Sequence, residues 1–256
     1  MTVGPTTELA SLWTARSDPS PSPWGTYFRT DTTRLTFREL WRISSRLPVS
    51  LAACLKKVLG LRHPARWAVC HEDAIRVVPA SEIPDNALRV LEPVVEEFQR
   101  LGARLVFYHT GATVGNLEAF AAVLLPSEHD AVILVTWVRA QFSGPGKESS
   151  GYVVTSHLQD GTFLSTTNHP RRLNTPPEYR VLRLRDGTPS AVFRRHQHAL
   201  GEAESSAIRV RNDEEAKNMI LEIKHRTFQW HVARGVWVPL THEELARLGI
   251  AGGEVP

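Results

Sequence analysis

The chain has 256 residues, of which 42% are apolar and 22% are charged, and its formal net charge is +3. This is the ordinary composition of a globular protein of one large domain, and it excludes disorder of the whole chain. The longest apolar run, residues 131 to 138, is broken by Thr136. It is much shorter than the roughly 20 residues that cross a bilayer, so we expect no transmembrane segment.

Cysteine usage and the first residues indicate the compartment. There are two cysteines, Cys54 and Cys70, and both lie within apolar stretches, whereas a secreted disulfide framework needs more of them. The start of the sequence lacks a basic segment followed by an apolar core, so we expect no secretory signal. These observations predict a cytoplasmic protein.

Positive charge is concentrated in the N-terminal quarter. Residues 1–66 contain ten Lys/Arg and four Asp/Glu, a balance of +6, whereas residues 67–256 contain twenty and twenty-three, a balance of −3. This asymmetry predicts that the N-terminal segment meets an acidic surface, which is nucleic acid, lipid headgroups or the acidic remainder of the chain.

Residues 1–33 form the first predicted segment. A Pro/Ser tract at residues 17–23 and the lack of hydrophobic periodicity predict a flexible leader. Its aromatic residues are unusual for a disordered segment, so we expect one or two of its rings to pack against the body; the candidates are Trp13, Trp24, Tyr27 and Phe28.

Residues 34–62 form a predicted pair of basic amphipathic helices. Thr36 and Glu39 make a capping box at the start of the first helix. Pro48 ends that helix and begins the second, which Gly60 closes. The predicted apolar face consists of Phe37, Leu40, Trp41, Leu47, Leu51, Leu55, Val58 and Leu59.

Three interpretations of this helix pair remain open. In the simplest, its apolar face packs against the sheet while the basic side chains stay in solvent. In the second, the pair meets a membrane or a partner protein, and the candidate binding residues are Arg38, Trp41, Arg42, Lys56 and Lys57. The third is a helix-turn-helix DNA reader, which is disfavoured because base-reading polar residues do not cluster at the start of the second helix.

Residues 65–256 are predicted to form a single α+β domain. Two short apolar runs within residues 66–78 flank His71, Glu72 and Asp73, a pattern typical of a hairpin. A helical apolar stripe follows over residues 84–101. Because an interior proline costs about 3 kcal/mol, Pro93 predicts a kink or two short helices there.

The midsection is predicted to be an antiparallel meander. Strand-like runs occur at residues 103–109, 117–125, 131–139, 152–157 and 162–167, with a further candidate at 179–184. Several connections are too short for parallel crossovers. Helices are expected at residues 190–200 and 213–233, with a short one after Thr241. The predicted fold is therefore α+β, with a mainly antiparallel five- to seven-stranded sheet packed against the kinked helix and the C-terminal helices, and with a basic helical N-terminal arm.

No sequence motif indicates a metal or a cofactor, and we predict neither. The zincin pattern and paired Cys-x-x-Cys are absent. The candidates for catalysis are His109, His157 and Asp160 at predicted strand ends, since an imidazole oriented by a carboxylate can act as a general base. No nucleophile stands out beside them.

A second cluster of arginines surrounds the candidate strand at residues 179–184. It includes Arg171 and Arg172, which are candidate binding residues for a phosphate or an acidic ligand. The cluster could equally neutralise acidic residues of the same chain, and we prefer this intramolecular interpretation.

The sequence favours a non-catalytic binding or scaffold protein that contacts a partner or an anionic surface through its basic N-terminal arm. The first alternative is a hydrolase with a histidine–carboxylate site, and the second is a DNA-binding protein, although we expect no nucleic-acid partner. The sequence predicts no oligomeric state.

Overall fold

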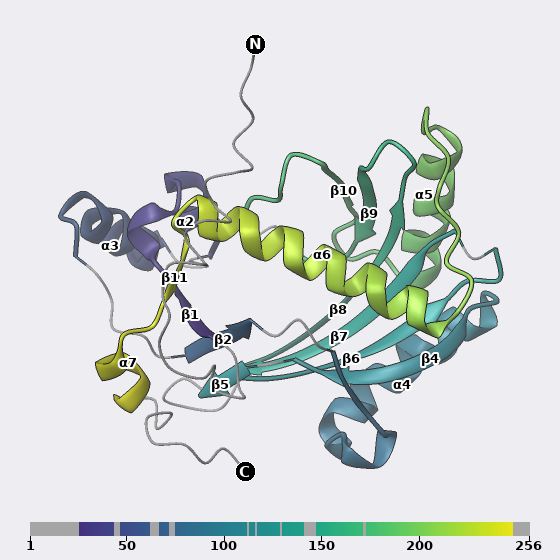
Figure 1. Cartoon of the computed structure of the whole chain (residues 1–256), viewed down its shortest axis with the longest axis horizontal. Coiled ribbons are helices and arrows are strands. Elements are labelled where there is room, and N and C mark those ends of the chain that lie inside the picture. The colour runs from purple at the N-terminus through teal and green to yellow at the C-terminus, as the bar shows by residue number, and fades with distance from the viewer. Residues whose placement is uncertain are drawn as a thin grey trace, which may run out of the picture.

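A large sheet and a small sheet organise the protein, which is shown as a computed structural model in Figure 1. The structure describes residues 26–43, 47–61, 67–71, 75–111, 113–115, 117–128, 130–140, 147–170 and 173–247. The strands are β1 (Thr26–Thr30), β2 (Trp67–His71), β3 (Arg76–Val78), β4 (Arg104–Thr110), β5 (Thr113–Gly115), β6 (Leu117–Leu125), β7 (Val132–Ala140), β8 (Lys147–His157), β9 (Phe163–Thr167), β10 (Tyr179–Arg183) and β11 (Trp237–Pro239). The helices are α2 (Phe37–Ile43), α3 (Leu47–Val58), α4 (Asp85–Arg100), α5 (Pro189–Gly201), α6 (Asp213–Ala233) and α7 (His242–Arg247), with short 3-10 turns at Thr32–Arg34 and Ala80–Glu82.

The large sheet has seven strands in the order β10-β9-β8-β7-β6-β4-β3. Its neighbours pair antiparallel except β9 and β10, which are parallel. Hairpins join β6 to β7 to β8 to β9, because their connections are short enough to return the chain directly. The predicted α+β class and the mainly antiparallel sheet are confirmed.

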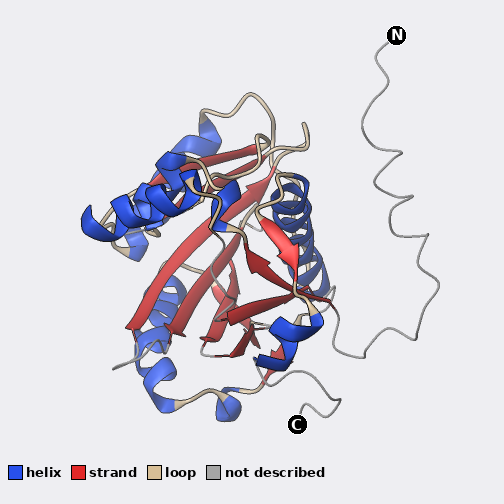
Figure 2. Cartoon of the chain, turned by 90° about the vertical axis from the view of Figure 1, so that its left-hand side faces the viewer, coloured by secondary structure: helices blue, strands red, loops and turns tan. Residues whose placement is uncertain are grey.

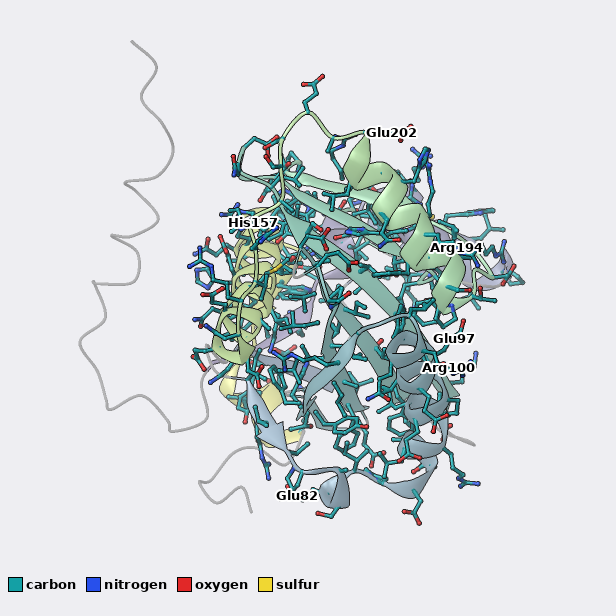
Figure 3. All side chains as sticks on the ribbon, turned by 90° about the vertical axis from the view of Figure 1, so that its right-hand side faces the viewer. Glu82, Glu97, Arg100, His157, Arg194 and Glu202 are labelled. Atoms are coloured by element: carbon teal, nitrogen blue, oxygen red, sulfur yellow. The ribbon has the colours of Figure 1, made fainter. Side chains whose placement is uncertain are left out.

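Helices cover both faces of this sheet (Figures 1 and 3). One buried cluster combines α4 and α5 with alternate residues of β6 and β7, such as Leu124, Ile133 and Trp137. The other combines α6 with the intervening residues, such as Val123 and Val132. Side chains alternate between the faces of a strand. Because both faces of β6 and β7 are covered by helices, consecutive residues of these strands are apolar.

Helix α4 runs unbroken through Pro93. Proline removes one helical hydrogen bond, but Pro93 lies on the exposed side, where water can satisfy the carbonyl that loses its partner. The alternative of two short helices is therefore wrong. Gly102 follows the helix with a φ of 90°, a left-handed conformation that glycine adopts without strain.

The small sheet has the order β11-β1-β2-β5 and is antiparallel. The hairpin predicted over residues 66–78 is wrong, because β2 pairs with β1 and β5 while β3 pairs with β4 of the large sheet. Strand β1 falls within the predicted leader. Its Tyr27 and Phe28 are buried, as expected for rings that pack on the body, and the Phe28 ring meets Phe228 at 4.6 Å. Residues 1–25 lie outside the described residues.

Candidate interaction surface

Glu39 fixes helix α2 to the body of the protein. Its side chain is fully buried. Thr36 N–H donates to Glu39 Oε2 at 2.8 Å and Glu39 N–H donates to Thr36 Oγ1 at 3.2 Å, which confirms the predicted capping box. The guanidinium of Arg234, which follows α6, donates to both carboxylate oxygens at 3.0 and 2.7 Å, and Asn174 N–H adds a bond of 2.9 Å.

These bonds keep Glu39 ionised. Burial alone raises the pKa of its carboxyl group, but the hydrogen bonds from Arg234, Asn174 and Thr36 outweigh burial and lower the pKa to about 2. Because Arg234 neutralises this charge inside the protein, Glu39 contributes no negative charge to the surface of α2.

Only a narrow face of the helix pair is buried. Leu35, Leu40 and Val236 form a small cluster, against which the partly buried Ala53 and Cys54 of α3 pack. Since α3 presents small side chains to the body, its larger apolar residues face outward.

The outward face is apolar to an unusual degree. Nine of the eleven large apolar side chains that are exposed within the described residues lie between residues 37 and 61, at exposed fractions of 45% to 71%. We call these nine the α2–α3 surface: Phe37, Trp41, Ile43, Val49, Leu51, Leu55, Val58, Leu59 and Leu61. Figure 2 faces the end of the molecule that carries α2 and α3.

The simplest interpretation of the sequence, that the apolar face packs against the sheet, is therefore wrong. Leu40 is buried, but the predicted apolar residues Leu51, Leu55, Val58 and Leu59 are all more than half exposed. The side chain of Leu47 lies outside the described residues. The anchoring of Glu39 rotates α2 so that Leu40 meets the body while Phe37 and Trp41 do not.

Basic side chains surround the α2–α3 surface. Arg38 is exposed, and Arg42 donates to Asn174 Oδ1 at 3.1 Å. Lys57 donates to the carbonyl of Thr33 and holds its ammonium 5.6 Å from the centre of the Phe37 ring. Lys56 is half-buried. The segment from residue 34 to residue 61 contains no acidic residue besides the buried Glu39, so its surface charge is wholly positive.

The structure does not bring the candidate catalytic histidines together. His109 on β4 lies opposite Ala121, which lies opposite Thr136, which lies opposite Gly151 of β8. His157 is six residues further along β8, a separation of roughly 20 Å along the strand alone. Burial lowers the pKa of His109 to about 4, although the carbonyl of Thr110 opposes this shift.

His157 and Asp160 each have other contacts. The His157 ring stacks on Phe163 at 4.4 Å, and its Nδ1 lies 3.8 Å from a carboxylate oxygen of Glu222. The carboxylate of Asp160 accepts bonds from the N–H and hydroxyl of Thr162 at 2.9 and 2.7 Å, which closes the turn between β8 and β9. The geometry thus offers no histidine–carboxylate pair among the three predicted residues.

A serine–histidine pair that the sequence did not single out lies beneath α5. Ser156 Oγ and His196 Nε2 are 2.9 Å apart, and the two residues are 0% and 1% exposed. Ser156 donates its hydroxyl hydrogen to the carbonyl of Asp130 at 2.6 Å, so His196 Nε2 must be the donor to Ser156. The hydroxyl of Thr166 then donates to His196 Nδ1 at 3.1 Å.

This arrangement is opposite to that of a catalytic pair, in which the imidazole accepts the serine proton. It also excludes substrate, because both groups are buried. Burial lowers the pKa of His196 to about 4, so the ring is neutral. The pair serves to satisfy polar groups between β8, β9 and α5.

The remaining sequence-based site residues and the comparisons with known proteins add no functional assignment. Arg171 and Arg172 lie outside the described residues. Within the described parts of the chain, no group of three or more His, Cys, Asp or Glu residues is placed to hold a metal ion, and no helix is long and apolar enough to cross a membrane. No protein-family model, curated protein or solved structure matches this chain.

Proposed function

We propose that this chain is a non-catalytic binding protein that docks on the headgroup region of an anionic lipid bilayer through the α2–α3 surface. The observation that carries the proposal is the combination of nine exposed apolar side chains with basic side chains on a segment whose one acidic residue, Glu39, is buried. Tryptophan, phenylalanine and leucine beside lysine and arginine are typical of helices that lie in the membrane interface.

The magnitudes support this mode of binding. Burying the exposed half of one leucine contributes about 1 kcal/mol. Each lysine or arginine close to the surface of an anionic membrane adds about 1 kcal/mol. Several such residues together give reversible binding without a membrane-spanning helix. A DNA partner is less well supported, because α3 exposes leucines where a recognition helix presents polar side chains.

Binding to vesicles tests the proposal. We expect the full chain to sediment with vesicles that contain phosphatidylglycerol and less with neutral phosphatidylcholine vesicles, and we expect the affinity to fall as salt rises. Replacing Leu55→Glu together with Val58→Glu removes apolar contact and adds repulsion, so the partition coefficient should fall roughly a hundredfold.

The matched control is Val77→Glu together with Ile208→Glu. These two side chains are also large, apolar and exposed, at 50% and 43%, but they lie outside the α2–α3 surface. The control should bind vesicles as the unmodified chain does. Equal loss in both double variants, or no binding to anionic vesicles, would contradict the proposal. Concentration-dependent dimerisation that only Leu55→Glu/Val58→Glu abolishes would instead assign the surface to a second copy of the chain.

A further inference from the structure

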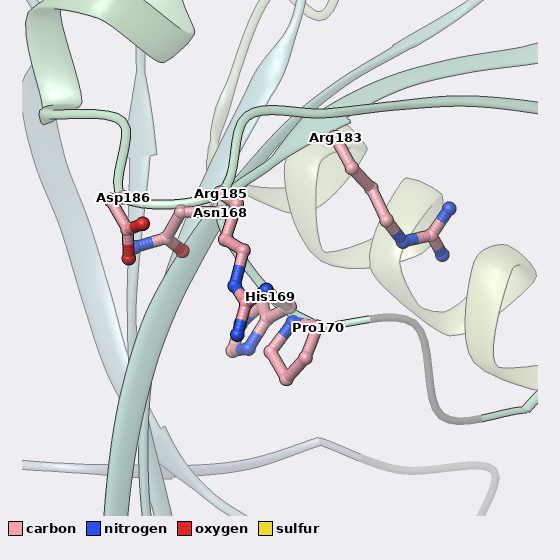
Figure 4. A pocket seen from close by; sticks show the side chains of 6 residues that line it. All are labelled: Asn168, His169, Pro170, Arg183, Arg185 and Asp186. Carbon is pink, nitrogen blue, oxygen red and sulfur yellow. The ribbon is translucent and has the colours of Figure 1, made fainter. Parts of the chain in front are cut away.

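A cavity of about 460 Å³ opens where strands β9 and β10 end. Figure 4 shows the side chains that line it, with Arg185, His169 and Pro170 at the centre of the view. The lining residues are Asn168, His169, Pro170, Arg183, Arg185 and Asp186. A volume in this range suits a small organic ligand.

The topology explains why polar residues gather here. Strands β9 and β10 form the parallel pair of the large sheet, so their carboxyl ends lie at the same edge. Asn168 to Pro170 follow β9 directly, and Arg183 to Asp186 end and follow β10. In sheets with parallel strands, ligands bind at this end because the segments that leave the strands converge there.

Hydrogen bonds to the sheet hold the β9 side of the cavity in place. Asn168 Oδ1 accepts from Tyr152 N–H at 2.8 Å. His169 N–H donates to Thr167 Oγ1 at 3.0 Å, and Thr167 donates to the carbonyl of Tyr152 at 2.7 Å. The β9 end of the cavity is therefore fixed to the backbone of β8.

The ring of His169 is also fixed. Thr136 Oγ1 donates to the carbonyl of Gly151 at 3.2 Å, so the bond of 3.1 Å between Thr136 and His169 Nε2 has the histidine as its donor. The ring lies directly over Gly151, where a Cβ atom would come within 2.5 Å of His169 Cε1. Glycine in the middle of β8 therefore makes room for one wall of the cavity.

The charge of the lining favours an anion. Two arginines, Arg183 and Arg185, and one carboxylate, that of Asp186, are among the lining residues, so their side-chain charges sum to +1. Arginine binds phosphate oxygens with two parallel hydrogen bonds. From this lining and the volume of the cavity, we propose that it binds the phosphomonoester group of a small organic ligand. This inference does not depend on the proposed docking of α2 and α3 on a membrane.

Calorimetric titration of the full chain tests the inference, with glycerol 3-phosphate as the probe and inorganic phosphate as the minimal one. We expect saturable 1:1 binding of glycerol 3-phosphate, and at least tenfold weaker binding after Arg185→Gln. The matched control is Arg180→Gln, which removes an exposed arginine of the neighbouring β10 that does not line the cavity, and it should bind as the unmodified chain does.

A variant that keeps every charge provides an independent check. Gly151→Ala displaces His169 and should weaken binding severalfold, with unfolding transitions of all variants recorded to verify that they are folded. No saturable binding of either probe, or equal weakening by Arg180→Gln and Arg185→Gln, would overturn the inference.

The phosphomonoester could belong to a soluble metabolite or to a lipid headgroup, and vesicles distinguish these sources. Phosphatidic acid carries a phosphomonoester, whereas phosphatidylglycerol carries a diester. If vesicles of equal charge bind better with phosphatidic acid, and Arg185→Gln removes that preference, the ligand is a lipid. If glycerol 3-phosphate binds and the vesicles show no preference, the ligand is soluble. Binding to phosphatidylglycerol itself reports on the α2–α3 surface and not on the cavity.

Discussion

Glu39→Gln is expected to destabilise the protein by about 3 kcal/mol, the magnitude typical of removing one partner from a buried ion pair. Glutamine has nearly the same shape, but it supplies one acceptor oxygen where the carboxylate uses both. The guanidinium of Arg234, the N–H of Asn174 and the N–H of Thr36 then compete for it. The free energy of unfolding from urea denaturation of the full chain measures this loss.

The control for this experiment is Glu243→Gln. Glu243 pairs with Arg247 four residues away on α7, and both side chains are more than half exposed, so its loss should change the stability by less than about 0.5 kcal/mol. A Glu39→Gln variant as stable as the Glu243→Gln variant would contradict the anchoring role.

The double variant Glu39→Leu/Arg234→Met tests whether the cost of Glu39→Gln comes from leaving Arg234 without its partner. Removing both charges leaves no buried charge without a partner, so this variant should recover much of the stability that Glu39→Gln loses. Hydrogen exchange at the amides of α2 and α3 locates the effect. We expect faster exchange there in Glu39→Gln than in the unmodified chain, because the anchor between α2 and the end of α6 is weakened.

The large sheet could be predicted from the sequence because its signals are local. The runs at residues 117–125 and 131–139 are long and apolar, and short polar connections join them, so an antiparallel meander follows directly. The small sheet could not be predicted in the same way. The pattern around His71 is the same for a hairpin and for two strands in different sheets, and the choice depends on β1 and β5, which are distant in sequence.

The candidate interaction surface was predicted only in part. Amphipathic spacing identified the apolar and basic residues of α2 and α3, but it does not say which side of a helix meets the body. That orientation depends on the contact of Glu39 with Arg234, 195 residues away. The capping box at Thr36 was recognisable, whereas the partner of its glutamate was not.

The cavity and the serine–histidine pair were missed for a related reason. Asn168 and Arg185 meet because β10 lies parallel to β9 at the sheet edge, and neither residue belongs to a short motif. Gly151 was a usable signal, since a glycine inside a strand often marks the close approach of another group. In the sequence it fell at the edge of an apparent loop.

Acidification below pH 6.5 is expected to unfold the protein, because three histidines are buried in the neutral state. Burial is the main cause in each case and lowers the pKa of His109, His196 and His231 to about 4. The positive charge of Arg234 lowers the pKa of His231 further, while Glu39 opposes this. In the unfolded chain each histidine has a pKa of about 6.5.

The sign of the pH dependence follows from proton counting. Between pH 6.5 and 4 the unfolded chain binds up to three more protons than the folded chain, so the free energy of unfolding falls as the pH falls. At pH 5 each buried histidine lowers the free energy of unfolding by about 2 kcal/mol. The sum of about 6 kcal/mol is comparable with the whole stability of many domains. Glu39 contributes stability that is lost at lower pH, between the ordinary carboxyl pKa of 4.5 and its folded pKa of about 2.

Urea denaturation between pH 7.5 and 4.5 measures this dependence, and His109→Leu assigns part of it. His109 Nε2 is buried without a hydrogen-bond partner, so leucine is tolerated better there than at His196, whose two ring nitrogens are both bonded. In this variant one fewer proton is taken up on unfolding. The slope of the unfolding free energy against pH should therefore fall by up to about 1.4 kcal/mol per pH unit. Gln197→Leu, which changes an exposed residue of α5 that carries no titratable group, should leave the slope unchanged. A profile that is flat from pH 6.5 to 4.5 would show that the buried rings do not control acid unfolding, and equal slopes in His109→Leu and the unmodified chain would exclude His109 from it.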